Sequence, residues 1–171
     1  MGVGRGGPSG GSLGEPRSQQ AGKSSLINAG VLPALAEGAI PGSDRWLPLC
    51  ARPGQDLLTE LESAGLPGAA ADGLVAAAES RLAAEPDYDH LLLVIDQFEE
   101  LLTQPVLDSH QRADDRRLRA VDQLVELGGS SAAVTVLLVM RNDFYAPLDA
   151  LAVHLLELGY TWVSVFCLRR S

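Results

Sequence analysis

Apolar and polar positions alternate along the chain in blocks that predict an α/β domain. Short, nearly continuous apolar runs have the length of strands that are buried on both faces. Between them lie longer stretches in which apolar side chains recur every three or four residues, as in amphipathic helices. We expect strands at 46–51, 90–95, 133–140 and 160–168, and helices at 23–37, 55–64, 72–84, 110–127 and 147–158. This alternation predicts a mainly parallel sheet flanked by helices.

Glycine and proline mark where several of these helices break or end. Gly30 and Pro33 fall inside the first helical stretch and should kink or divide it, because proline lacks the backbone N–H that an α-helix needs. The Gly-Leu-Pro-Gly sequence at 65–68 separates the next two helices. Gly128 and Gly129 should close the long helix that starts at 110.

The composition favours one domain and limits its partners. With 171 residues, 46% of them hydrophobic, the chain is long enough for a domain with its own core. Residues 1–20 are rich in Gly, Ser and Pro and should be disordered, so residues 21–171 form the expected domain. The net charge of −9 argues against nucleic acid as a partner, because binding to its phosphates needs clustered Lys and Arg.

The same sequence features indicate a cytoplasmic protein. No apolar run reaches the roughly twenty residues of a membrane span, and the N-terminus lacks the apolar core of a signal peptide, so we expect no membrane partner. Cys50 and Cys167 lie in apolar stretches and suit small buried side chains in a reducing compartment. The histidines are scattered, so any metal should arrive with a nucleotide.

Residues that could bind a ligand or a metal ion include one at the end of the most apolar run. Asp96 directly follows residues 91–95, and open α/β sheets bind ligands at the carboxyl ends of their strands. Upstream, Gly22-Lys23-Ser24 is the core of a phosphate loop, in which backbone N–H groups and a lysine hold phosphates while a hydroxyl binds magnesium. Together the two motifs suggest nucleotide binding.

Each motif also has a purely structural interpretation. Asp96 can be the N-cap of a helix that starts at Gln97, in which case Glu99 and Glu100 only complement the helix dipole. Lys23 can be an ordinary exposed lysine in a first helical turn. The order of the motifs favours nucleotide binding, because a phosphate loop, a helix and then a buried strand with a terminal Asp is the order that an α/β nucleotide-binding fold requires.

Four segments together resemble a known family. GKSSLINAGVLPAL at 22–35, RWLPLCARPG at 45–54, LLLVIDQFEELLT at 91–103 and LLVMRNDFYAPL at 137–148 are similar to the STAND class of P-loop NTPases. More narrowly they resemble the bacterial novel-STAND domains, often found in large proteins with WD repeats. The resemblance implies an ATP-driven signalling switch in which Walker A and Walker B motifs bind ATP and Mg²⁺.

The resemblance also implies roles for individual residues. Lys23 would contact the β and γ phosphates, Ser24 would bind Mg²⁺, and Asp96 would hold the same ion through water. Glu99 or Glu100 would orient or activate the attacking water, with Gln97 as the alternative. Arg141 matches the sensor arginine of the family and would touch the γ-phosphate, although a structural salt bridge is the other interpretation. The remaining residues of the expected nucleotide-binding set are Gly7, Gly10, Gly22 and Ser25.

The chain departs from the family pattern at its N-terminus and its C-terminus. The phosphate loop needs a glycine five positions before Gly22, but that position is Arg17. Removing residues 11–20 joins Gly7–Gly10 to residues 21–24 and restores the pattern, so we interpret residues 11–20 as an insertion. The strand that should lead into the loop is missing, and the resemblance fades after Leu148. We therefore expect a truncated domain, part of a larger protein.

Two functions of different classes remain open from the sequence. The first is an ATP-binding switch domain that hydrolyses ATP slowly if at all and engages protein partners, or copies of itself, through domains absent here. The second is a degenerate module that keeps the scaffold without using nucleotide, or a non-functional fragment. Thermal stabilisation by ATP would separate them, because a ligand that selects the native state raises its stability.

Overall fold

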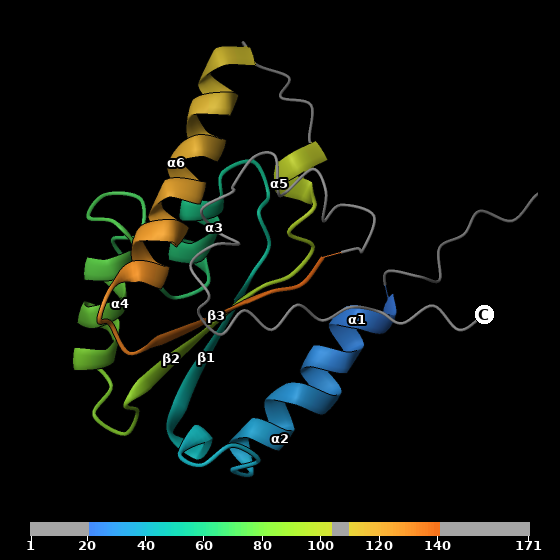
Figure 1. Ribbon diagram of the computed structural model, residues 1–171, viewed down its shortest axis with the longest axis vertical. Helices are drawn as coiled ribbons and strands as arrows, with labels where there is room; N and C mark the ends of the chain where they lie inside the picture. The colour runs from blue at the N-terminus through green and yellow to red at the C-terminus, as the bar shows by residue number, and fades with distance from the viewer. Residues whose placement is uncertain (1–20, 104–109, 141–171) are drawn as a thin grey trace, which may run out of the picture.

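A computed structural model describes residues 21–103 and 110–140 of the chain (Figure 1). Its centre is a sheet of three parallel strands in the order β1-β2-β3, formed by β1 (Trp46–Ala51), β2 (His90–Ile95) and β3 (Val134–Leu138). The first two strands have the bounds that the apolar pattern predicts, and the third is shorter. The fold class is confirmed as an α/β arrangement with a parallel sheet and flanking helices.

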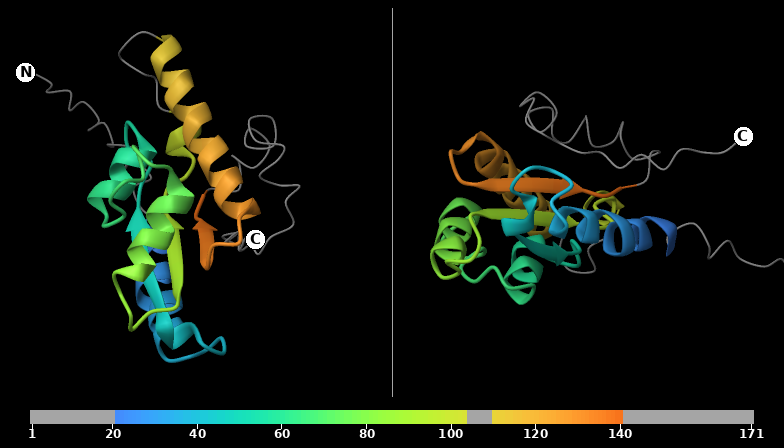
Figure 2. Two further views of the ribbon diagram at one scale, coloured as in Figure 1. Left: turned by 90° about the vertical axis from the view of Figure 1, so that its left-hand side faces the viewer. Right: turned by 90° about the horizontal axis from the view of Figure 1, so that it is seen from below.

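Alternation along β2 buries both faces of the sheet. Leu91, Leu93 and Ile95 belong to the larger core, together with side chains of α3 (Leu57–Ser63), α4 (Leu74–Ala83) and α6 (His110–Gly129). Leu92 and Val94 point to the opposite face. There they pack with Ile27 and Leu137 beneath the first helical segment, so the two layers lie on either side of the sheet (Figures 1 and 2).

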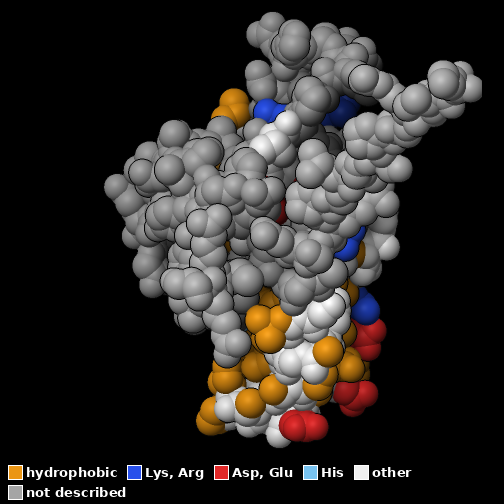
Figure 3. Space-filling model, turned by 90° about the vertical axis from the view of Figure 1, so that its right-hand side faces the viewer, with side chains coloured by type: hydrophobic (Ala, Val, Ile, Leu, Met, Phe, Trp, Pro, Cys, Tyr) orange, Lys and Arg blue, Asp and Glu red, His pale blue; other side chains and the backbone are white. Residues whose placement is uncertain are grey.

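The first helical segment is divided, as Gly30 and Pro33 predict. It consists of α1 (Ala21–Leu26), the π-helical turn η1 (Ile27–Val31) and α2 (Leu32–Ala36). The Leu32 N–H reaches back to the Ile27 carbonyl, five residues earlier, and Pro33 stands in the first turn of α2, where a missing N–H is tolerated. Figure 3 shows the face of the molecule that lies on the right in Figure 1. Hydrophobic side chains gather over the lower part of its described surface.

Pro48 lies on the outer edge of the sheet. The carbonyl oxygens of Arg45 and Ala51 accept hydrogen bonds from Asp89 N–H and Asp96 N–H at 3.1 and 2.9 Å, so both face β2. Because the bonding direction alternates along a strand, Pro48 faces away from β2, where its missing N–H breaks no bond within the sheet. The register pairs Ala51 with Ile95, which brings the ends of β1 and β2 level.

Several sequence predictions are corrected by the structure. Helix α6 runs through Gly128 and Gly129 rather than stopping before them. Cys50 is exposed rather than buried, because β1 lies at the edge of the described sheet. The predicted helix at 147–158, the strand at 160–168 and the disorder of residues 1–20 fall outside the described residues. Within the part of the chain that is described, no helix is long and apolar enough to cross a membrane.

Candidate functional site

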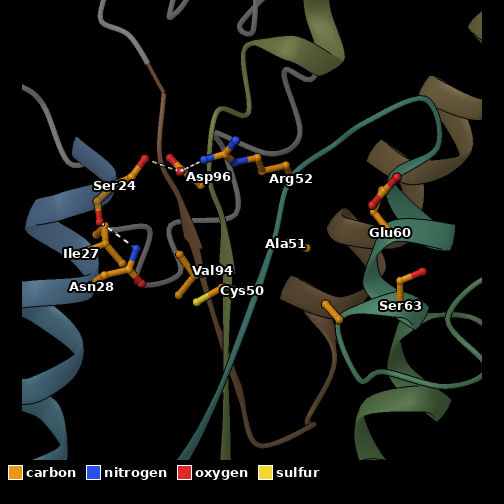
Figure 4. A pocket seen from close by; sticks show the side chains of 11 residues that line it. Ser24, Ile27, Asn28, Cys50, Ala51, Arg52, Glu60, Ser63, Val94 and Asp96 are labelled. Atoms are coloured by element: carbon orange, nitrogen blue, oxygen red, sulfur yellow. Dashed lines mark hydrogen bonds and ion pairs between the residues drawn. The ribbon is translucent and has the colours of Figure 1, made fainter. Parts of the chain in front are cut away.

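Ser24 and Asp96 meet at the carboxyl edge of the sheet. The Ser24 hydroxyl donates a hydrogen bond to the Asp96 carboxylate with an Oγ to Oδ2 distance of 2.5 Å, across 72 residues of sequence (Figure 4). Packing of Ile27 against Val94 fixes α1 above β2, and this places the two side chains opposite each other. The structure therefore brings together the two residues that the sequence assigns to a metal ion.

The other oxygen of Asp96 is held by the backbone that follows it. Asp96 Oδ1 accepts from the Gln97 N–H at 2.9 Å, and the Asp96 side chain is 16% exposed. Gln97 has a φ of 56°, a left-handed conformation that a non-glycine residue adopts at a cost and that clusters at functional sites. Residues 96–99 form a turn, and α5 (Glu100–Thr103) begins after it. The interpretation of Asp96 as the N-cap of a helix from Gln97 is therefore wrong.

Arg52 is a second charged group at this edge, and none of the sequence motifs assigns it a role. It directly follows β1 and its guanidinium forms an ion pair with Asp96, with an Nη2 to Oδ2 distance of 3.7 Å (Figure 4). Asp96 was found because it follows a buried strand. The same rule, applied to the strand at 46–51, would have found Arg52.

Two glutamates follow Asp96 on the same turn and helix. Glu99 is only 6% exposed, and its Oε2 has no hydrogen-bond partner among the described residues. Burial raises the pKa of the Glu100 carboxyl above its usual range, Arg52 opposes this, and the charges of Glu99 and Asp96 add to it. The site thus gathers acidic groups around one described cation, Arg52.

A pocket of about 460 Å³ opens beside the Ser24–Asp96 pair. It lies between α1 and η1 on one side and α3 on the other, and it reaches around the end of β1 (Figure 4). Its polar walls are formed by Ser24, Asn28, Arg52, Glu60, Ser63 and Asp96. The volume falls within the range of sites for small molecules and cofactors.

The other predicted site residues are only partly placed. Gly22 and Lys23 lie in α1 with Ser24, and Ser25 is exposed on the same helix. The Lys23 side chain is not among the described ones. Gly7, Gly10 and Arg141 lie outside the described residues.

The described donors suit a magnesium ion that comes with a phosphate ligand. Mg²⁺ commonly takes one or two protein oxygens and completes its shell with water and phosphate oxygens. Ser24 and Asp96 offer such a pair, and their hydrogen bond shows that both oxygens face one point. Among the described residues, no three His, Cys, Asp or Glu side chains form a self-sufficient metal site. The Ser24 and Asp96 oxygens therefore fit Mg²⁺ that arrives with a phosphate ligand.

The parallel sheet with its flanking helices, the Gly-Lys-Ser helix and the strand-terminal Asp are consistent with a P-loop-like fold. A family model described as Novel STAND NTPase 1 matches residues 20–162, and the chain belongs to this family. Comparisons with curated proteins and with solved structures gave no match.

Proposed function

We propose that this domain is an ATP-binding switch that uses Mg²⁺ and hydrolyses ATP slowly if at all. The observation that carries the proposal is the 2.5 Å hydrogen bond between Ser24 and Asp96, since it joins the hydroxyl and the carboxylate that a P-loop site uses for its metal. Membership of a STAND NTPase family supports nucleotide use in general.

In this proposal the chain's own groups bind and orient the triphosphate. Lys23 contacts the β and γ phosphates, and Ser24 and Asp96 hold Mg²⁺, which when bound offsets phosphate charge. Gly7, Gly10, Gly22 and Ser25 complete the loop around the phosphates. Arg141 acts as the sensor of the γ-phosphate.

Of the three candidates for handling the attacking water, Glu100 is the one that we favour. Its raised pKa makes it a stronger proton acceptor than an ordinary carboxylate, and it is partly exposed. Glu99 is buried, and Gln97 carries no charge, so Gln97 can only position a water. Low turnover suits a switch, because the bound nucleotide then persists while partner domains or further copies associate.

Titration calorimetry of Mg-ATP into the full chain and into Asp96→Asn tests the proposal. We expect at least about ten-fold weaker binding by Asp96→Asn, because a charge-assisted contact is lost. Asp89→Asn is the matched control, since Asp89 stands before β2, at the opposite end of the strand, and pairs with Arg45. Equal binding by the parent and Asp96→Asn would reject the metal role of Asp96.

A nucleotide-independent interaction module is the second candidate. The broken spacing of the phosphate loop at residues 11–20 favours it. An unchanged melting temperature of the full chain at saturating Mg-ATP would support this module and reject the switch.

A further inference from the structure

We propose that Arg52 exchanges partners during nucleotide binding, from the Asp96 carboxylate in the free domain to a phosphate oxygen once a metal ion occupies Asp96. This inference rests on the proposed function and adds a residue and a step that the motifs do not assign. It starts from the register of the sheet, which sets Ala51 beside Ile95 and therefore Arg52 beside Asp96.

The ion pair between Arg52 and Asp96 is weak enough to break when a ligand binds. The 3.7 Å separation is too long for a hydrogen bond, and Asp96 Oδ2 already accepts from the Ser24 hydroxyl. The Arg52 side chain is 58% exposed, whereas that of Asp96 is 16% exposed. Exposed ion pairs contribute little to stability, so the guanidinium can move at small cost.

The backbone beneath Arg52 is, in contrast, tightly held. Pro53 is buried, and Gly54 adopts a φ of 51° against the Glu60 side chain. Asp56 then caps α3 by accepting from the Leu58 N–H at 3.2 Å. Because the backbone at Arg52 is held in place while its guanidinium can move, the positive charge stays close to the pocket before and after the exchange of partners.

The charge of the described pocket lining favours a cation at the position of Arg52. Arg52 is the single Lys or Arg among the described residues that line it, whereas Glu60 and Asp96 line it and Glu100 lies within electrostatic range of Asp96. These carboxylates repel a triphosphate. A planar guanidinium offsets that repulsion and matches phosphate geometry with two parallel N–H groups.

The test compares Arg52→Ala with Arg45→Ala in the full chain by calorimetric titration of ATP, once with Mg²⁺ and once with EDTA. Arg45 is a matched control, because it precedes β1, pairs with Asp89 and is 54% exposed. We expect Arg52→Ala to weaken Mg-ATP binding about ten-fold and ATP binding in EDTA by clearly less, while Arg45→Ala matches the parent. Arg52→Lys should recover part of the affinity, since it keeps the charge but not the planar fork.

The outcomes separate the two proposals. If the parent and Arg45→Ala bind no nucleotide, the proposed function fails, and this inference fails with it. If the parent binds and Arg52→Ala binds equally well or more tightly, Arg52 is only a counter-ion of Asp96, and the inference alone is overturned. If Arg52→Ala loses ATP affinity equally with Mg²⁺ and with EDTA, the proposed exchange of partners is also overturned. Circular dichroism of each variant confirms that the fold is retained.

Discussion

Ser24 Oγ donates a hydrogen bond to Asp96 Oδ2 at 2.5 Å although 72 residues separate them in sequence. We therefore expect the effects of Ser24→Ala and Asp96→Asn on Mg-ATP affinity to be non-additive. Each single variant should lose about ten-fold, and the double variant should lose clearly less than the product of the two. Calorimetry on the four proteins of this cycle measures the coupling. Full additivity would show that the two side chains serve separate ligands.

Lys23 is the only lysine in the chain, so amine chemistry can follow it without mutation. If Lys23 contacts phosphates, bound Mg-ATP should slow its modification by an amine-reactive reagent, with the N-terminal amine as the internal control. Mass spectrometry of the peptide that contains residue 23 measures the rate. Lys23→Ala should weaken ATP binding about ten-fold or more. Labelling at the same rate with and without nucleotide would argue that the phosphate loop is not assembled.

Glu100 should make the stability of the domain fall as pH rises through its titration range. Its pKa is raised in the folded state, chiefly by burial, so the folded chain holds more protons than the unfolded chain between the ordinary Glu pKa and the raised one. Stability is therefore lost with increasing pH in that window. In Glu100→Gln this loss should disappear, as measured by urea unfolding at a series of pH values. Glu79→Gln, an exposed position on α4, is the control and should follow the parent.

Gly54 should tolerate alanine less well than Gly42. Both glycines have positive φ, 51° and 85°, so alanine adds about 1–2 kcal/mol of backbone strain at either position. A Cβ at Gly54 would also lie 2.6 Å from Glu60 Oε1, whereas a Cβ at Gly42 meets nothing within 4 Å. The free energy of unfolding should therefore fall further for Gly54→Ala. Equal losses would mean that Glu60 moves aside freely.

Deleting residues 11–20 should improve ATP binding only slightly. A looped-out insertion that doubles the length of a loop costs about 0.6 kcal/mol of closure entropy, which corresponds to about a three-fold change in affinity. Calorimetry on the deletion variant checks this. A gain of a hundred-fold would show that the insertion itself prevents the phosphate loop from forming.

The sequence predicted the strands better than it predicted the turns. The bounds of residues 90–95 follow from the sequence because a strand buried on both faces is apolar throughout. The bounds of 46–51 also agree, although Pro48 and Cys50 of that strand are exposed. The left-handed φ of Gln97 in the turn after β2 could not be predicted, since no residue type in that stretch indicates it. The place of Arg52 at a strand end could be predicted from the sequence, but its ion pair with Asp96 could not, because that contact depends on the register between two strands that are far apart in sequence.

Pro48 affects which edge of the sheet can pair with a further strand. A strand that joins a sheet must bond to a free row of N–H and C=O groups, and Pro48 removes a donor from the middle of the outer row of β1. Pairing at that edge is weakened at its centre, so the β3 edge of the described sheet is the more favourable place for any further strand, whether from this chain, from a longer form of the protein or from a second copy. Extension of this sheet would then leave the pocket beside β1 uncovered.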